Sequence, residues 1–146
     1  MKRVIFLILA LQILLVSVCN AFEPPTDKRW FWLDSTDKYG MWFDTESPQY
    51  IISDTYGHKN HKQVNAWILV YNVNDKISSK QAVTYDLTCK QSKINNIIMY
   101  DDNNNNLGSQ SYPYADFKSI PPETFSELIL QVCQIAWDTD PRNNLR

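Results

Sequence analysis

The amino-acid sequence predicts an α+β domain in which β-strands come first and a single α-helix comes last. From Arg29 to Tyr112, apolar residues recur in short, mostly alternating runs that turn residues separate, a pattern typical of strands. After Ile120 the apolar residues instead recur at the spacing of one helix face. Cys89 ends a strand-like run and Cys133 lies in the helical part, so a disulfide could join the two parts.

A charged and then apolar leader opens the chain. Two basic residues precede the run Val4–Val18, and small residues follow around Cys19. This order predicts a signal peptide over residues 1–21, cleaved before Phe22, and an exported protein of the periplasm, cell surface or extracellular space. A lipid anchor on Cys19 is the alternative and would place the chain on a membrane, but the bulky Val18 before the cysteine disfavours it. An uncleaved membrane anchor is a further alternative.

The body that follows the leader is acidic. The full chain has a net charge of −2, and the leader carries two of its basic residues. No basic run is present, so the sequence argues against nucleic acids and anionic lipid surfaces as partners. We expect one domain over residues 22–136 and a polar tail over residues 137–146.

The strand pattern divides the body into short segments. The first two predicted strands form a hairpin, and the polar segment Asp54–Lys62 is interpreted as a loop. In the longest strand, Val64 and the alternate apolar residues up to Val70 face one way and Trp67 faces the other. The predicted strands are Arg29–Asp34, Tyr39–Asp44, Tyr50–Ser53, Gln63–Val73, Gln81–Cys89, Lys93–Tyr100 and Leu107–Tyr112.

The predicted helix begins after a proline pair. Pro121 and Pro122 suit a first helical turn, and Glu123 suits the positive end of the helix dipole. From Trp137 onward the sequence is polar and is interpreted as a tail. One apolar stripe runs along the helix: Phe125, Leu128, Ile129, Val132, Cys133 and Ala136.

Two cysteines are candidates for a disulfide. Cys89 lies on the apolar face of its strand and Cys133 lies on the apolar stripe of its helix. If the helix packs on that strand face, the two sulfurs can meet, and export to an oxidising compartment favours the bond. Closing a loop of about 45 residues would stabilise the fold by about 4 kcal/mol. The alternative is two buried free thiols.

No group of residues predicts catalysis. His58 and His61 stand close together in the polar segment, but no Cys or Glu cluster beside them supplies further metal ligands, so we expect no metal site. Asp34, Asp44 and Asp86 are interpreted as carboxylates at strand ends or on solvent faces. A nucleophile pair and a glycine-rich phosphate loop are both missing from the sequence, so we expect no enzyme and no cofactor.

The tryptophans raise the question of what covers the second face of the sheet. One helix covers one face only, whereas Trp30, Trp32 and Trp67 place large apolar groups on the other. Either a strongly curved sheet encloses its own core, or these aromatics form a contact surface for a protein partner or for self-association.

Together these segments resemble the surface-adhesin protein E-like domains of bacterial envelope proteins. The similarity extends from Arg29 to Cys133 and depends on the order and spacing of its parts. Two local departures are Phe117, where the family tends to have Trp, and Glu123, where it tends to have Gly. The matching residues are Trp30–Asp34, Trp42-Phe43-Asp44, Val64 and Trp67 with Tyr71, Tyr85-Asp86 with Cys89-Lys90, Met99–Asp102, Gly108, Ile120-Pro121-Pro122, Glu127 and Val132-Cys133.

The resemblance implies about six antiparallel strands with the C-terminal helix packed on them and tied by a Cys89–Cys133 disulfide. It implies no enzymatic activity. The name-giving member is an outer-membrane lipoprotein that binds host matrix and serum proteins and can dimerise, so we expect an exported binding domain that resembles an adhesin. The alternative is a housekeeping protein of the envelope or periplasm with a structural role or an unrelated partner. The matched residues are scaffold, and none is taken over as a ligand-binding residue.

Overall fold

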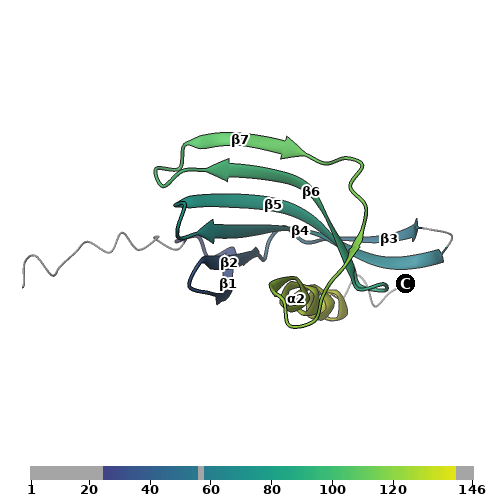
Figure 1. Cartoon of the computed structure of the whole chain (residues 1–146). Coiled ribbons are helices and arrows are strands. Elements are labelled where there is room, and N and C mark those ends of the chain that lie inside the picture. Colours follow the sequence, from purple (N-terminus) through teal and green to yellow (C-terminus); the bar gives the residue numbers. More distant parts are fainter. Residues whose placement is uncertain (1–24, 56–57, 141–146) are drawn as a thin grey trace, which may run out of the picture.

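The computed structural model describes residues 25–55 and 58–140 of the chain. Within these residues a single sheet of eight strands is followed by one helix (Figure 1). The predicted signal peptide, Cys19 and the cleavage site before Phe22 lie outside the described residues. The elements are β1 (Trp30–Ser35), β2 (Tyr39–Asp44), β3 (Gln49–Thr55), β4 (His58–Asn72), β5 (Ile77–Asp86), β6 (Gln91–Tyr100), β7 (Asn106–Ser111), β8 (Lys118–Ser119) and α2 (Phe125–Thr139).

All strand pairs in the sheet are antiparallel, which confirms the predicted α+β class. The strand order is β1-β2-β4-β5-β6-β7. One edge of β4 pairs with β5, while the other edge is shared: β3 pairs with its first part and β2 with its last. The short β8 pairs with the start of β6. The sheet therefore has eight strands, where the family resemblance implies about six.

The segment Asp54–Lys62 was wrongly expected to be a loop. β3 continues to Thr55 and β4 begins at His58, so the two strands form a hairpin. The pairs Ile52 with Lys62 and Ser53 with His61 continue the ladder through residues that are polar on β4. A run of polar residues has no apolar alternation to mark it as a strand, and here the pairing with β3 decides the conformation.

The start of α2 follows the predicted pattern. Thr124 is the N-cap, and its Oγ1 accepts a hydrogen bond from the backbone N–H of Glu127 at 3.3 Å. Glu127 Oε2 accepts in return from the N–H of Glu123 at 2.6 Å. This reciprocal pair satisfies backbone donors that the first helical turn leaves without partners.

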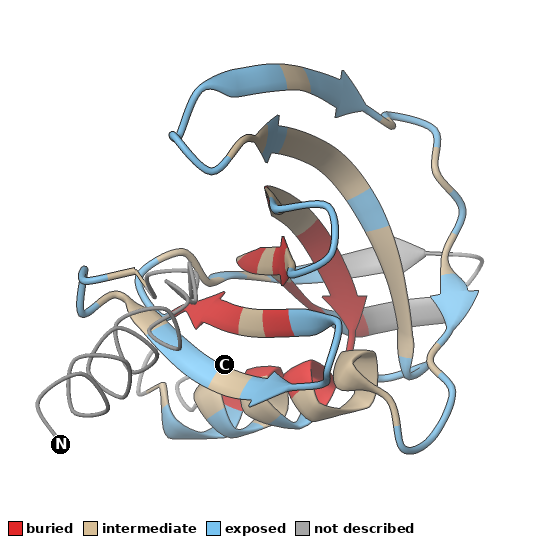
Figure 2. Ribbon diagram, turned by 60° about the vertical axis from the view of Figure 1, so that its left-hand side comes forward, coloured by how far each residue is buried: buried red, intermediate tan, exposed pale blue. Residues whose placement is uncertain are grey.

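The main core lies between α2 and one face of the sheet. Its β4 members are alternate residues from Val64 to Ile68, as the sequence predicts. Two of its buried helix members, Ile129 and Cys133, belong to the predicted stripe, whereas Leu130 and Trp137 do not. In Figure 2 the buried residues follow β2, β4, β5 and the inner side of the helix, whereas β7 is mostly exposed. The buried members are Phe43, Val64, Ala66, Ile68, Val83, Tyr85, Leu87, Ile129, Leu130, Cys133 and Trp137.

The end of α2 corrects the predicted domain boundary at residue 136. The helix runs to Thr139, and Trp137 is buried in the main core with only 5% of its surface exposed. Trp137 comes four residues after Cys133 and so continues the apolar stripe. Because the residues around Trp137 are polar, the sequence pattern predicted a tail there and not a further helical turn. Residues 141–146 of the predicted tail lie outside the described residues.

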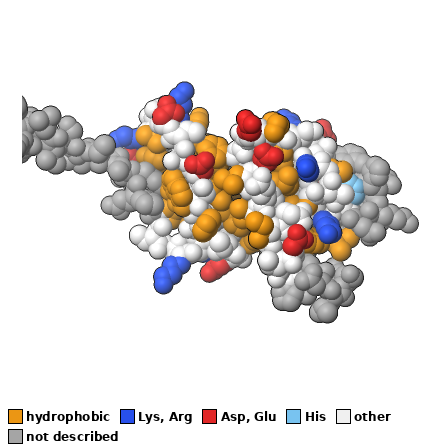
Figure 3. All heavy atoms as spheres, turned by 90° about the horizontal axis from the view of Figure 1, so that it is seen from below, with side chains coloured by type: hydrophobic (Ala, Val, Ile, Leu, Met, Phe, Trp, Pro, Cys, Tyr) orange, Lys and Arg blue, Asp and Glu red, His pale blue; other side chains and the backbone are white. Residues whose placement is uncertain are grey.

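A smaller cluster lies on the sheet face that points away from α2. Trp42, Leu69 and Tyr71 are buried there, with Trp30 packed against them. On the opposite side, where α2 and the β1–β2 hairpin lie, hydrophobic side chains gather at the surface (Figure 3). Ile135 of α2 is 64% exposed. The sheet thus supports two separate apolar clusters, one on each face.

Candidate functional site

A hollow of about 190 Å³ lies beside Trp67 on the sheet face that α2 leaves uncovered. Alternation along β4 turns Trp67 away from the main core, as the sequence predicts, and the side chain is half-buried. Its partner on β5 is Ala82, whose small side chain leaves space beside the indole. The lining residues are Ser47, Gln49, Asn65, Ala66, Trp67, Ala82, Val83 and Asn95, all of them uncharged.

A ladder of polar side chains crosses three strands along one wall of this hollow. Thr84 Oγ1 donates to Asn65 Oδ1 at 2.6 Å, and Asn95 Nδ2 donates to Thr84 Oγ1 at 2.8 Å. Asn95 is the extra residue at a β-bulge, where the register shifts opposite Ala82 and Val83. Bulges re-aim side chains, and this one brings an amide to the edge of the hollow. The ladder leaves Asn65 Nδ2 and Asn95 Oδ1 as the donor and acceptor that a ligand could meet.

The neighbouring residue Asn96 adds a buried acceptor to the same sheet face. It pairs with Ala82, which in turn pairs with Trp67, so the three residues form a row across β6, β5 and β4. Within the described residues, Asn96 Oδ1 is buried and has no hydrogen-bond partner. Leaving such an acceptor unpaired costs about 1–3 kcal/mol.

The three tryptophans proposed as contact residues have different surroundings. Trp32 is 47% exposed and packs edge-to-face on Trp42, with 4.7 Å between ring centroids. Trp30 belongs to the smaller cluster, and Lys80 Nζ lies 5.9 Å from its ring centroid. Only Trp67 lines the hollow. Part of the second face is thus packed on itself, and part of it is a hollow lined by Trp67.

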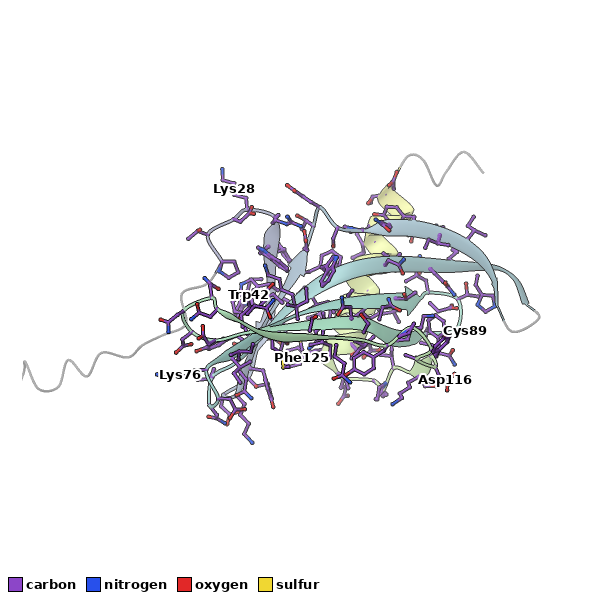
Figure 4. The ribbon with its side chains drawn as sticks, turned by 90° about the horizontal axis from the view of Figure 1, so that it is seen from above. Lys28, Trp42, Lys76, Cys89, Asp116 and Phe125 are labelled. Carbon is purple, nitrogen blue, oxygen red and sulfur yellow. The ribbon has the colours of Figure 1, made fainter. Side chains whose placement is uncertain are left out.

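A second polar cluster joins three side chains at one end of β4 and β5. His61 Nδ1 lies 2.7 Å from Asp86 Oδ2 and 3.8 Å from Cys89 Sγ. His61 and Asp86 are buried, whereas Cys89 lies in an exposed turn. In Figure 4 Cys89 lies at the end of the sheet away from Lys76 and Trp42. No local sequence pattern joins these residues, because His61 is 25 positions from Asp86.

The carboxylate of Asp86 organises this cluster. Oδ1 accepts from the backbone N–H of Cys89 at 2.8 Å, and Oδ2 accepts from Gln63 Nε2 at 3.3 Å as well as contacting His61. Burial by itself would raise the pKa of Asp86, but the hydrogen bonds from His61, Cys89 and Gln63 together hold it below its usual value. The carboxylate is therefore kept ionised and fixed in orientation.

The predicted Cys89–Cys133 disulfide is not formed in the structure, where both cysteines are free thiols. Strand β5 ends at Asp86, so its alternation does not carry Cys89 to the face on which α2 packs. The turn places Cys89 beside His61 instead. Cys133 is fully buried in the main core, and burial raises the pKa of its thiol to about 12.

The other carboxylates proposed at strand ends have local partners. Asp44 is buried and forms an ion pair with Arg29, whose Nε donates to Oδ1 at 3.0 Å. Asp34 is exposed and accepts from the backbone N–H of Ser35 at 2.7 Å. These contacts give both residues structural roles.

Comparison with known proteins identifies no relative: no family model, curated protein or solved structure matches the chain. In residues 25–55 and 58–140, no helix has the length and apolar character that crossing a bilayer requires.

Proposed function

We propose that the chain is an exported, non-enzymatic binding domain that holds a protein partner in the hollow beside Trp67. The observation that carries this proposal is a half-buried indole in a hollow of about 190 Å³ on the sheet face that α2 does not cover. Aromatic side chains are enriched where proteins bind one another, because they bring a large apolar area with little loss of conformational entropy.

The chemistry of the hollow favours an uncharged segment of a protein as the ligand. No charged side chain lines it. Asn65 Nδ2 and Asn95 Oδ1 match the carbonyl and N–H groups of a peptide backbone, and Trp67 offers a flat surface to an apolar side chain. An extended segment laid across β4, β5 and β6 could reach all three residues.

The leader and the family resemblance support a place for this binding in the cell envelope. Export would bring the domain to host matrix or serum proteins, as the resemblance to protein E-like domains suggests. A Cys89–Cys133 bridge would then belong to an oxidised form of the domain, in which Cys89 has left His61. The alternative function is a housekeeping envelope protein, which would use the same hollow for a structural partner.

Binding of the purified mature chain to immobilised extracellular-matrix and serum proteins tests the proposal. Trp67→Ala should weaken capture by about tenfold or more, since a buried contact aromatic often contributes 2 kcal/mol or more to binding. Ala82→Leu should weaken it as well, because the larger side chain fills the hollow. The matched control is Ile135→Ala, which removes an exposed apolar side chain from the opposite side.

Thermal melts of the same variants separate binding from folding. Trp67 is only half-buried, so Trp67→Ala should cost less than the roughly 3–5 kcal/mol expected for a fully buried tryptophan. Loss of capture in Trp67→Ala and Ala82→Leu, with both proteins folded, supports the proposal. Equal capture by wild type and both variants would overturn it, and failure of the wild type to bind any protein tested would favour the housekeeping alternative.

A further inference from the structure

Three side chains of different chemistry point their donor atoms at one place where β4 and β5 end. A ring nitrogen of His61, a carboxylate oxygen of Asp86 and Sγ of Cys89 all lie within 4.8 Å of one another. Nitrogen, oxygen and sulfur donors are the three ligand types that proteins offer to zinc. We propose that His61, Asp86 and Cys89 bind a divalent transition-metal ion, with Zn²⁺ the best match.

The distance between the nitrogen and sulfur donor atoms is close to that of a tetrahedral site. With Zn–N and Zn–S bonds of about 2.0 and 2.3 Å, tetrahedral angles place the nitrogen and sulfur about 3.6 Å apart. The separation between His61 Nδ1 and Cys89 Sγ is 3.8 Å. Tetrahedral ligation would place nitrogen and oxygen about 3.3 Å apart, whereas His61 Nδ1 and Asp86 Oδ2 share a hydrogen bond at 2.7 Å. The metal replaces that proton, and the two atoms separate by about half an ångström.

The geometry distinguishes a metal site from a cysteine-based catalytic triad. In a triad the nucleophile and the carboxylate contact different nitrogens of the histidine ring, so that a proton can pass through it. Here Asp86 and Cys89 both lie nearest to Nδ1 of His61. Three ligand atoms that lie around one point can bind the same cation. They are not arranged to pass a proton from the cysteine through the histidine ring to the carboxylate.

Surrounding contacts hold two of the ligands in position. The backbone N–H of Cys89 and the side chain of Gln63 donate to Asp86, as outer hydrogen bonds do at metal sites. The backbone also pins the turn to β4, since Leu87 N–H donates to the carbonyl of Lys62 at 2.8 Å. The turn therefore presents Cys89 to His61 in a fixed place.

Charge and access also suit a divalent cation. The Asp86 carboxylate and the Cys89 thiolate together supply two negative charges, which neutralise the ion in a partly buried site. A sulfur ligand disfavours Mg²⁺ and Ca²⁺, which take oxygen ligands. His61 and Asp86 are buried while Cys89 is exposed, so the ion can enter from the Cys89 side, where the fourth position is open to water.

The test is a titration of the reduced mature chain with Co²⁺, which reports thiolate ligation by a sulfur-to-metal absorption band. The Cys133→Ala variant is the reference, because it cannot form the Cys89–Cys133 disulfide. We expect one Co²⁺ per chain, displaced by Zn²⁺. Adding Cys89→Ser should abolish the band, and adding His61→Ala should weaken affinity by about a hundredfold or more, beyond the effect of losing an outer hydrogen bond.

Circular dichroism shows whether each variant is folded before its Co²⁺ binding is measured. Cys89 is exposed, so Cys89→Ser is expected to fold even if the buried His61→Ala does not. A folded Cys133→Ala protein that gives no band, or a band that survives Cys89→Ser, would overturn the proposal. The result is independent of the Trp67 hollow, which lies about 20 Å along β4 from His61, at about 3.3 Å per residue.

Discussion

Trp137 packs edge-to-face against Tyr50, with 5.5 Å between the ring centroids, and so fastens the last turns of α2 to β3. Lys62 Nζ lies 5.8 Å from the same indole. Strand β3 has no other strand outside it in the described part of the sheet, where it pairs with β4 alone. The tryptophan therefore anchors the helix end and a strand at the margin of the sheet together.

We expect Trp137→Ala to destabilise the domain by about 3–5 kcal/mol, because it leaves a cavity between α2 and β3. Urea unfolding followed by circular dichroism measures the change. Ile135→Ala is the control, since its exposed side chain should change the free energy of unfolding by about 0.5 kcal/mol or less. Equal effects of the two substitutions would show that residues 137–140 are a dispensable tail after all.

Gly40 allows two aromatic rings to pack over the backbone of β2. A Cβ at this position would lie 2.8 Å from Trp42 Cη2 and 3.4 Å from Trp32 Cζ3. We expect Gly40→Val to displace the Trp32–Trp42 pair and to cost about 1–3 kcal/mol of stability. Near-ultraviolet circular dichroism, which reports the indole environment, should change together with the unfolding midpoint. An unchanged aromatic spectrum would contradict the expected displacement.

The elements that were predicted well from the sequence are those with a sustained apolar period. Alternation from Val64 to Val70 and the stripe from Phe125 to Cys133 each place several residues in one core. The start of β4 was missed because the polar residues from His58 onward carry no such period. Trp137 also follows the helical period, but the polar residues next to it led to the prediction of a tail from Trp137 onward.

The two candidate sites depend on pairings that the sequence does not reveal. His61 meets Asp86 because β4 and β5 pair in the register that places Gln63 opposite Asp86. The hollow depends on Ala82 lying opposite Trp67. Neither register follows from local patterns, since a shift by two residues would preserve the alternation. The expectation that His61 binds no metal was based on the residues near it in the sequence, and Asp86 and Cys89 are near it only in space.

The two thiols in the body should differ sharply in reactivity. Cys133 is fully buried and burial raises its pKa to about 12, so at pH 8 it has almost no reactive thiolate. We expect iodoacetamide to label Cys89 in the native protein and to label both residues after unfolding, as peptide mass spectrometry will show. The opposite result would be that neither residue is labelled after unfolding unless a reductant is added. The protein would then carry the disulfide, and the free-thiol state would be contradicted.

The carboxylate of Asp86 should make the free energy of unfolding of the domain depend on pH. Its pKa in the folded chain is below the usual value of about 3.9, so the unfolded chain takes up its proton first as the pH falls. The stabilisation is therefore complete above about pH 5 and is lost as the pH falls through about 4 toward the lower folded pKa.

We expect Asp86→Asn to be less stable than wild type at pH 7, with a difference that shrinks between about pH 4.5 and pH 2.5 as the wild type loses this contribution. Urea unfolding at several pH values, with a chelator in every sample so that no metal contributes, measures the difference. A difference that stays constant down to pH 2.5 would show that the carboxylate is not preferentially ionised in the fold. The hydrogen bonds from His61, Cys89 and Gln63 would then have to be weaker than their geometry indicates.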